Sequence, residues 1–123
     1  MPSIPLISIV DDDDALRSAL ENLMRSAGLR AQGFSSAEAF LRSEQLHETG
    51  CLILDVRMPG MSGLELQRQM AVANSPIPII FITAHKDDAQ RTQVLEAGAV
   101  AFLHKPFYEE ELLNAINAAL KNS

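Results

Sequence analysis

Residues 7–14, Ile-Ser-Ile-Val-Asp-Asp-Asp-Asp, decide the fold, because a short and mostly apolar run changes at once into a run of acids. Two further apolar runs, at 52–54 and 79–82, are each followed by a polar residue, Asp55 after the first and Thr83 after the second. Strands that are apolar at nearly every position are covered on both faces, as in a parallel sheet. The sequence therefore predicts three buried parallel strands that end in polar residues.

Helical patterns fill the gaps between these strands. The first helix has apolar residues at spacings of three and four, ends at Gly28, and has Asp14 as its expected N-cap. Capping boxes at 35–38 and 62–65 predict that the second and third helices begin with the serine of each box. A fourth helix is expected to begin near Asp87, and a fifth has an apolar stripe made by Leu112, Leu113, Ile116 and Leu120.

Strand and helix alternate five times once two weaker strands, at 30–34 and 100–103, are included. This alternation predicts the α/β class: a three-layer (βα)5 doubly wound parallel sheet with helices on both faces. Five strands fit the flavodoxin-like order 2-1-3-4-5. We expect residues 1–123 to form a single domain, because this length leaves no room for a second one.

The charge and the cysteine content argue against several classes of protein. Ten basic and sixteen acidic residues give a net charge of −6, a poor match for nucleic acid or for anionic lipid. Cys51 is the only cysteine, so neither an internal disulfide nor a cysteine metal cluster is possible. The chain has no apolar run of transmembrane length and no basic start typical of a secretory signal, so we expect a cytoplasmic protein.

Polar side chains follow several strands, and ligands of open α/β sheets bind beyond the carboxyl ends of the strands. Asp11 and Asp12 follow the first strand, and Asp55, Thr83 and Lys105 follow the third, fourth and fifth. Carboxylates crowded at one edge raise one another's pKa unless a cation offsets them, and a hard divalent cation such as Mg²⁺ is the obvious candidate. A metal, an ammonium and a hydroxyl suit a phosphoryl group. Asp55, alone after an apolar strand, is the predicted nucleophile that forms an acyl phosphate.

Four motifs occur in order along nearly the whole chain: Val10-Asp11-Asp12-Asp13, Leu54-Asp55-Val56-Arg57-Met58-Pro59-Gly60-Met61-Ser62-Gly63, Ile82-Thr83-Ala84 and Lys105-Pro106-Phe107. With these motifs the sequence resembles the response-regulator receiver domain, the CheY-like fold of two-component signalling. Residues 57–63 and 97–107 are most similar to receivers of FixJ-like DNA-binding regulators. The resemblance implies a receiver over 1–123, with no output domain in this chain.

The resemblance also implies how the site works. Asp55 would accept a phosphoryl group from a phosphohistidine of a sensor kinase. Mg²⁺ would be held by Asp11, Asp12, Asp55 and the backbone carbonyl of Arg57. Lys105 would contact the phosphoryl oxygens. The domain would therefore be a signalling module with intrinsic phosphorylation and dephosphorylation chemistry, not a metabolic enzyme.

Further positions in the same family carry the signal outward. The resemblance implies that Thr83 swings towards the phosphate, that Phe102 rotates inward with it, and that Arg57 and His85 tune the lifetime of the phosphate. The Lys105–Pro106 peptide is expected to be cis. The surface made by the fourth helix, fifth strand and fifth helix would bind a partner or a second copy, and so regulate transcription through an output domain or a partner.

Two other functions fit parts of the sequence. A haloacid-dehalogenase-like phosphatase would use Asp11, Asp13, Thr83 and Lys105, but it leaves Asp55 without a role, and this chain is short for it. A pseudo-receiver would retain the fold for binding alone, although every key residue type of a receiver is present. The acidic run after the first strand is by itself also compatible with a solvated turn.

Overall fold

The computed structural model describes residues 4–84 and 87–121. Its five strands form one sheet in which every neighbouring pair is parallel, in the predicted order β2-β1-β3-β4-β5. β3 begins earlier than its apolar run and β5 lies one residue later than predicted. The strands are β1 (Leu6–Val10), β2 (Arg30–Phe34), β3 (Thr49–Asp55), β4 (Ile79–Thr83) and β5 (Ala101–His104).

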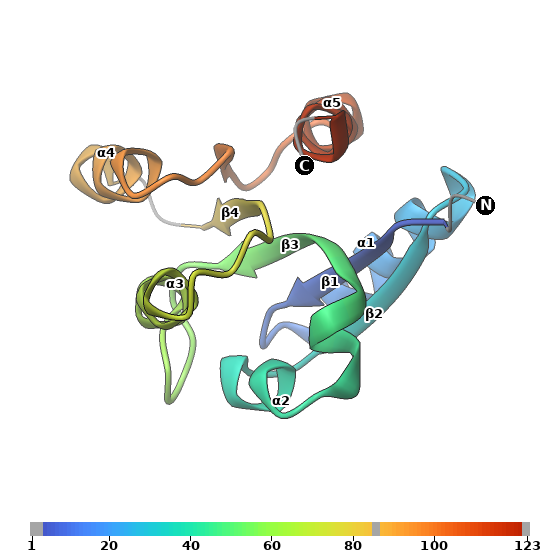
Figure 1. Ribbon diagram of the computed structural model, residues 1–123. Helices are drawn as coiled ribbons and strands as arrows, with labels where there is room; N and C mark the ends of the chain where they lie inside the picture. Colours follow the sequence, from blue (N-terminus) through green and yellow to red (C-terminus); the bar gives the residue numbers. More distant parts are fainter. Residues whose placement is uncertain (1–3, 85–86, 122–123) are drawn as a thin grey trace.

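Helices cover both faces of the sheet, which gives the three predicted layers (Figure 1). α1 and α5 pack on one face, and α2, α3 and α4 pack on the other. A short 3₁₀ helix that the sequence did not predict, η1 (Glu44–Glu48), leads into β3. Among the described residues, no helix has the length and apolarity needed to cross a membrane. The helices are α1 (Asp14–Ser26), α2 (Ala37–Leu41), α3 (Gly63–Val72), α4 (Asp88–Glu96) and α5 (Glu109–Lys121).

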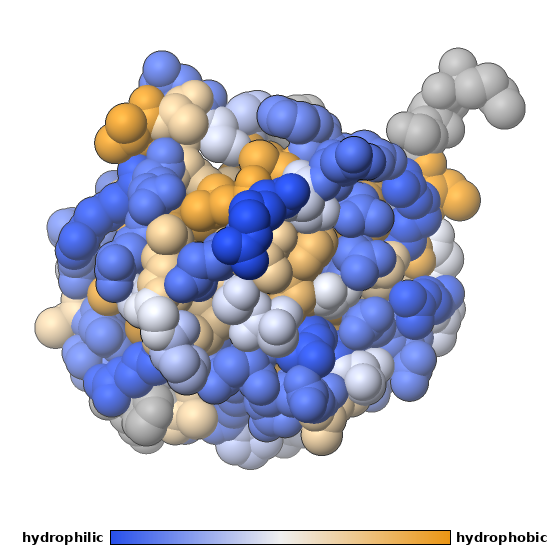
Figure 2. Space-filling model, turned by 90° about the horizontal axis from the view of Figure 1, so that it is seen from below, coloured by the Kyte–Doolittle hydropathy of each residue, from blue (hydrophilic) through white to orange (hydrophobic). Residues whose placement is uncertain are grey.

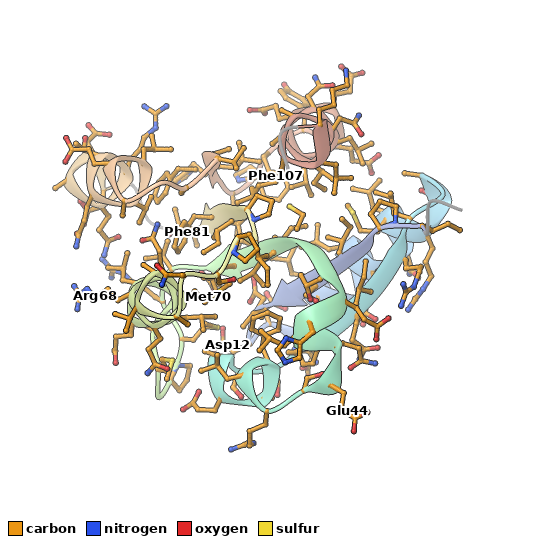
Figure 3. The ribbon with its side chains drawn as sticks, in the orientation of Figure 1. Asp12, Glu44, Arg68, Met70, Phe81 and Phe107 are labelled. Carbon is orange, nitrogen blue, oxygen red and sulfur yellow. The ribbon has the colours of Figure 1, made fainter. Side chains whose placement is uncertain are left out.

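Apolar side chains fill the two layers between the sheet and its helices. Figure 3 shows Phe81 of β4 and Met70 of α3 in one layer, and Phe107 beside α5 in the other. Arg68, on the outer side of α3, is exposed and points away from the sheet (Figure 3). Successive strand residues point to opposite faces, so one apolar strand supplies both layers. This burial explains why the central strands are apolar at nearly every position.

Two helix starts differ from the prediction. The N-cap of α1 is Asp13 and not Asp14, because the Asp13 carboxylate accepts from the amides of Ala15 and Leu16 at 3.0 and 3.1 Å. Asp14 is the first helical residue and forms an ion pair with Arg17. The prediction is wrong by one residue because either of two adjacent acids satisfies the N-cap preference.

The serine that caps the second helix is Ser36, not the predicted Ser35. The Ser36 hydroxyl accepts from the amide of Ala39 at 3.1 Å, so the third helical position is an alanine and no capping box forms. The capping box of α3 is confirmed: Ser62 Oγ accepts from the Glu65 amide at 3.2 Å, and the Glu65 carboxylate accepts from the Ser62 amide. The predicted start of α4 near Asp87 is confirmed, and Asp87 is its N-cap.

The register of the strands brings their carboxyl ends to one edge of the sheet. Val10 of β1 pairs with Leu54 of β3, so Asp11 and Asp55, which follow these two residues in the chain, lie at the same level. Asp55 pairs with Ile82 of β4, one residue before the strand's last residue, Thr83. The predicted site residues of three separate strands therefore lie at one edge.

Candidate functional site

The β1–α1 loop starts with two acids in opposite environments. Asp11 is completely buried, whereas Asp12 is exposed. One carboxylate oxygen of Asp11 accepts from the Asp13 amide at 2.9 Å. This hydrogen bond holds the buried carboxylate in one orientation at the end of β1.

Asp55, the last residue of β3, is held in place by the helix that follows it. A Cβ atom at Gly63 would lie 2.2 Å from the backbone oxygen of Asp55, so only glycine fits at the start of α3. The Gly63 amide donates to the Val56 carbonyl at 3.0 Å. The Arg57 amide donates to Asp55 Oδ1 at 3.4 Å. Close packing of the α3 start against β3 therefore fixes the backbone that carries Asp55.

Three carboxylates converge at this edge. One oxygen each from Asp11, Asp12 and Asp55 lies within 4.8 Å of the others. Burial raises the pKa of Asp55 to about 6, and the Asp11 charge adds to the rise. Lys105 and the Arg57 amide lower the pKa, and Asp12 raises it again. Burial is the largest of these effects, and the two groups that lower the pKa do not cancel it.

Lys105 brings an ammonium to the same carboxylates. Its Nζ atom lies 3.1 Å from Asp11 Oδ2 and 3.9 Å from Asp55 Oδ2. The Lys105 amide donates to the Thr83 carbonyl at 2.7 Å, which continues the pairing of β4 with β5. The Lys105–Pro106 peptide is cis, as the resemblance to receiver domains implied.

The predicted switch residues lie beside this cluster in different environments. Thr83 is completely buried at the end of β4. Phe102 is half-buried and packs against the apolar layer that α2, α3 and α4 cover. The Arg57 side chain is exposed next to the site. His85 lies outside the described residues.

The donor set fits a hard divalent cation. All three side chains of the cluster offer carboxylate oxygens, which Mg²⁺ prefers, and exposed Asp12 leaves room for retained waters. A positive charge placed among these three carboxylates would stabilise their ionised forms. The residues present therefore fit Mg²⁺, the metal that receiver domains generally use.

Glu38 has a role that the sequence did not predict. Its residue type suggested a capping box, but its carboxylate accepts from the Met61 amide at 3.3 Å, in the loop after Asp55. A Cβ atom at Gly60 would lie 2.6 Å from the same carboxylate. The spacing of residues 35–38 gave no signal for this contact, because it joins two segments distant in the sequence.

A hollow of about 500 Å³ lies at the opposite edge of the sheet. Its lining includes Leu46 of η1, Met70 of α3 and Ile77, which precedes β4. Figure 2 views the molecule from the side of α2 and shows hydrophobic surface among hydrophilic residues. This hollow has no contact with the carboxylate cluster, so the site is the open edge of the sheet rather than a deep pocket.

The fold and the site together define a class of signalling domain. The family model described as "Response regulator receiver domain" matches residues 7–117. The chain belongs to this family, whose members act in two-component systems and pair with sensor kinases. The resemblance inferred from the four sequence motifs is confirmed.

Individual relatives agree with this assignment. Response regulator protein TmoT of Ectopseudomonas mendocina is 54% identical over 116 residues, covering 94% of this chain and 53% of TmoT. Transcriptional regulatory protein FixJ of Bradyrhizobium diazoefficiens is 39% identical over 117 residues, covering 95% of this chain and 57% of FixJ. The solved structure of FixJ-N, with 36% identity and a TM-score of 0.89, covers 100% of this chain and 98% of its own. The chain spans about half the length of the curated relatives it matches.

Proposed function

We propose that this chain is a phosphoacceptor in which Asp55 receives a phosphoryl group from a phosphohistidine of a sensor kinase. The observation that carries the proposal is the convergence of three carboxylates with the Lys105 ammonium, which lies within 3.9 Å of Asp55 Oδ2. An anionic group that arrives at Asp55 meets the cation that its oxygens require. The cluster also explains why an acid ends the apolar β3.

The transfer needs one bond to form and one to break. A carboxylate oxygen of Asp55 attacks phosphorus, and the P–N bond to the donor imidazole breaks. The electron pair stays on the imidazole nitrogen, which takes a proton from solvent. Lys105 stabilises the charge on the equatorial oxygens, and the backbone around Asp55 supplies positioning. The product is an acyl phosphate on Asp55.

Asp11, Asp12, Asp55 and the backbone carbonyl of Arg57 would hold Mg²⁺. When bound, the cation neutralises phosphoryl oxygens and helps to align donor and acceptor. Each of the three acids contributes one carboxylate oxygen, and these oxygens lie within 4.8 Å of one another, which supports this ligand set. In the described structure the Lys105 ammonium pairs with the Asp11 carboxylate at 3.1 Å.

Phosphorylation would then bias two arrangements of the switch residues. The Thr83 hydroxyl donates to a phosphoryl oxygen, and Phe102 moves further into the apolar layer that it already touches. Arg57 and His85 tune how long the phosphate lasts by limiting the access of water. The half-buried state of Phe102 supports this role, because a side chain at such a boundary can move inward.

The changed surface of α4, β5 and α5 would bind a partner or a second copy of the chain. We infer that residues 1–123 act as one receiver unit and that the signal regulates transcription through an output domain or a partner. The name of FixJ, a transcriptional regulatory protein, supports this output. The net charge of −6 argues against direct DNA contact by these residues.

The phosphatase alternative lacks its second acid. That function needs Asp13 at the site, but the Asp13 carboxylate caps α1 and accepts from two helix amides. The alternative also leaves unused Asp55, which lies in the carboxylate cluster. The receiver function needs Asp55 in the cluster and does not need Asp13 there.

Phosphorylation with acetyl phosphate or phosphoramidate tests the proposal. With Mg²⁺, intact mass spectrometry should show one added phosphoryl group that is lost in hydroxylamine. Asp55→Asn should abolish the addition, whereas Asp88→Asn, the same charge change on exposed α4, should not. Labelling of Asp55→Asn, or no labelling of the natural chain, would overturn the proposal.

A further inference from the structure

Arg17 of α1 reaches back across the β1–α1 loop to Asp11, the first residue after β1. Its Nη1 atom donates to the backbone oxygen of Asp11 at 2.8 Å, and its Nη2 atom pairs with the Asp14 carboxylate. The Arg17 side chain is only 18% exposed, although four acids precede it within a few residues. One planar guanidinium therefore joins the first and last residues of the acidic run.

The place where Arg17 lies is made by a glycine in the neighbouring strand. A Cβ atom at Gly33 of β2 would lie 2.8 Å from Cγ and Cδ of Arg17 and 2.6 Å from Oε1 of Glu21. Gly33 is not among the glycines with positive φ, so its backbone does not require glycine. Glycine inside a strand marks a close approach, and here the approaching group is the Arg17 stem.

We propose that Arg17 is a positioning residue for the metal ligands and that Gly33 is the small residue that lets it lie against β2. The proposal rests on the proposed function, in which Asp11 and Asp12 hold Mg²⁺. Arg17 holds the carbonyl of Asp11, and the Asp11 carboxylate holds the Asp13 amide at 2.9 Å. These linked hydrogen bonds fix the direction in which the two acids leave β1.

A purely electrostatic role for Arg17 makes the opposite prediction. A guanidinium beside an acidic cluster repels a metal cation, so its removal would strengthen Mg²⁺ binding if charge were its only effect. If Arg17 instead orders the ligands, its removal weakens Mg²⁺ binding in spite of the lost repulsion. The sign of the change in affinity separates the two roles.

Mg²⁺ titrations followed by amide NMR shifts or by calorimetry measure that sign. Arg17→Met should weaken Mg²⁺ binding about tenfold, the size typical of a lost outer-shell partner. Gly33→Ala, which leaves the charge unchanged, should also weaken binding in the natural chain. It should have a much smaller effect when combined with Arg17→Met, because the guanidinium whose position the added methyl group disturbs is then gone.

Two measurements guard against a general loss of structure. The Asp13 amide should exchange with solvent faster in metal-free Arg17→Met, while denaturant unfolding shows that the core remains folded. Arg25→Met, which removes an arginine from the last turn of the same helix, should leave Mg²⁺ affinity unchanged. Arg25 contacts Glu21 and the Ala31 carbonyl instead of the acidic loop.

The outcomes are distinct. Equal or tighter Mg²⁺ binding by folded Arg17→Met would overturn the positioning role and leave the proposed function intact. Absence of Mg²⁺ binding by the natural chain would overturn the proposed function itself. Arg17→Lys should have an intermediate Mg²⁺ affinity. An ammonium keeps the charge but cannot make both contacts that the guanidinium makes, to the Asp11 carbonyl and the Asp14 carboxylate.

Discussion

The Nζ atom of Lys105 lies 3.1 Å from Oδ2 of Asp11, although 94 residues separate them in the chain. Asp11 is completely buried and Lys105 is 21% exposed, so the ammonium offsets a carboxylate that water does not reach. In the proposed function Mg²⁺ needs the same carboxylate. A bound metal would therefore compete with the ammonium for Asp11 until a phosphoryl group gave Lys105 another partner.

Lys105→Met should change stability and metal affinity in opposite directions. Without metal, the buried Asp11 carboxylate loses its ion-pair partner, and we expect the free energy of unfolding to fall by about 2 kcal/mol. Mg²⁺ should bind about tenfold more tightly because its competitor is gone, a change of about 1.4 kcal/mol. Denaturant unfolding in EDTA and Mg²⁺ titration measure both effects. Lys121→Met, on the exposed end of α5, is the matched control, and weaker Mg²⁺ binding by Lys105→Met would contradict the competition.

Asp55→Asn should stabilise the metal-free protein at neutral pH. The folded-state pKa of about 6 lies above the ordinary value of 3.8, so the folded protein holds this proton more tightly than the unfolded chain does. Stability therefore falls as pH rises from about 4 to about 6, and the full penalty remains above that range. The substitution removes the titrating group. We expect a gain of about 1–2 kcal/mol at about pH 8 that disappears near about pH 4.

Denaturant unfolding in EDTA at the two pH values checks this prediction. Adding Mg²⁺ should stabilise the natural chain and have less effect on Asp55→Asn, because one carboxylate ligand is lost. Glu44→Gln removes a charge from exposed η1 and serves as the control. A gain for Asp55→Asn that is the same at both pH values would show that relief of ionisation is not its cause.

Glu38→Ala should loosen the loop after Asp55 while leaving the core intact. The substitution removes the acceptor of the Met61 amide and the carboxylate packed on Gly60. We expect faster hydrogen exchange at the Met61 amide and a loss of about 1 kcal/mol of stability. Glu38→Gln should restore much of the protection, because its amide oxygen can accept the same hydrogen bond. Unchanged exchange in Glu38→Ala would mean that the loop holds its shape without this contact.

Cys51 should be unreactive in the folded protein. The side chain is completely buried in β3, and burial raises the pKa of its thiol to about 12. Because the thiolate is the reactive species, a disulfide reagent such as Ellman's reagent should label Cys51 only as the chain unfolds. Labelling measured across a denaturant series should follow the circular dichroism transition, with Cys51→Ala as the blank. Rapid labelling with native circular dichroism would contradict the burial of the thiol.

Local pattern was enough to predict most of the fold. The apolar runs at 52–54 and 79–82 have too few polar positions for a strand with one wet face, so they predicted a covered parallel sheet. The rule that ligands bind beyond the carboxyl ends of such strands then selected the residues at those ends. The structure confirms the strand order and brings Asp11, Asp12 and Asp55 together.

Choices between neighbouring residues could not be made from the sequence. Asp13 and Asp14 both satisfy the preference for an N-cap, as do Ser35 and Ser36, and only the path of the backbone selects one of each pair. Two adjacent residues of the same type have the same preference for the N-cap position. Moving the helix start by one residue changes the backbone geometry but not the type of residue at the cap. The predicted starts of α1 and α2 were therefore wrong by one residue.

The sequence by itself determined the alternation of strand and helix and the kinds of side chain at the strand ends, because both follow from local polarity. Only the tertiary structure decided which of these groups touch: Lys105 with Asp11, Glu38 with the Met61 amide, and Arg17 against Gly33. These contacts join residues on different elements, and their distances depend on sheet register and helix packing. No local pattern encodes such a distance, so the electrostatic balance of the site appears only when the chain is folded.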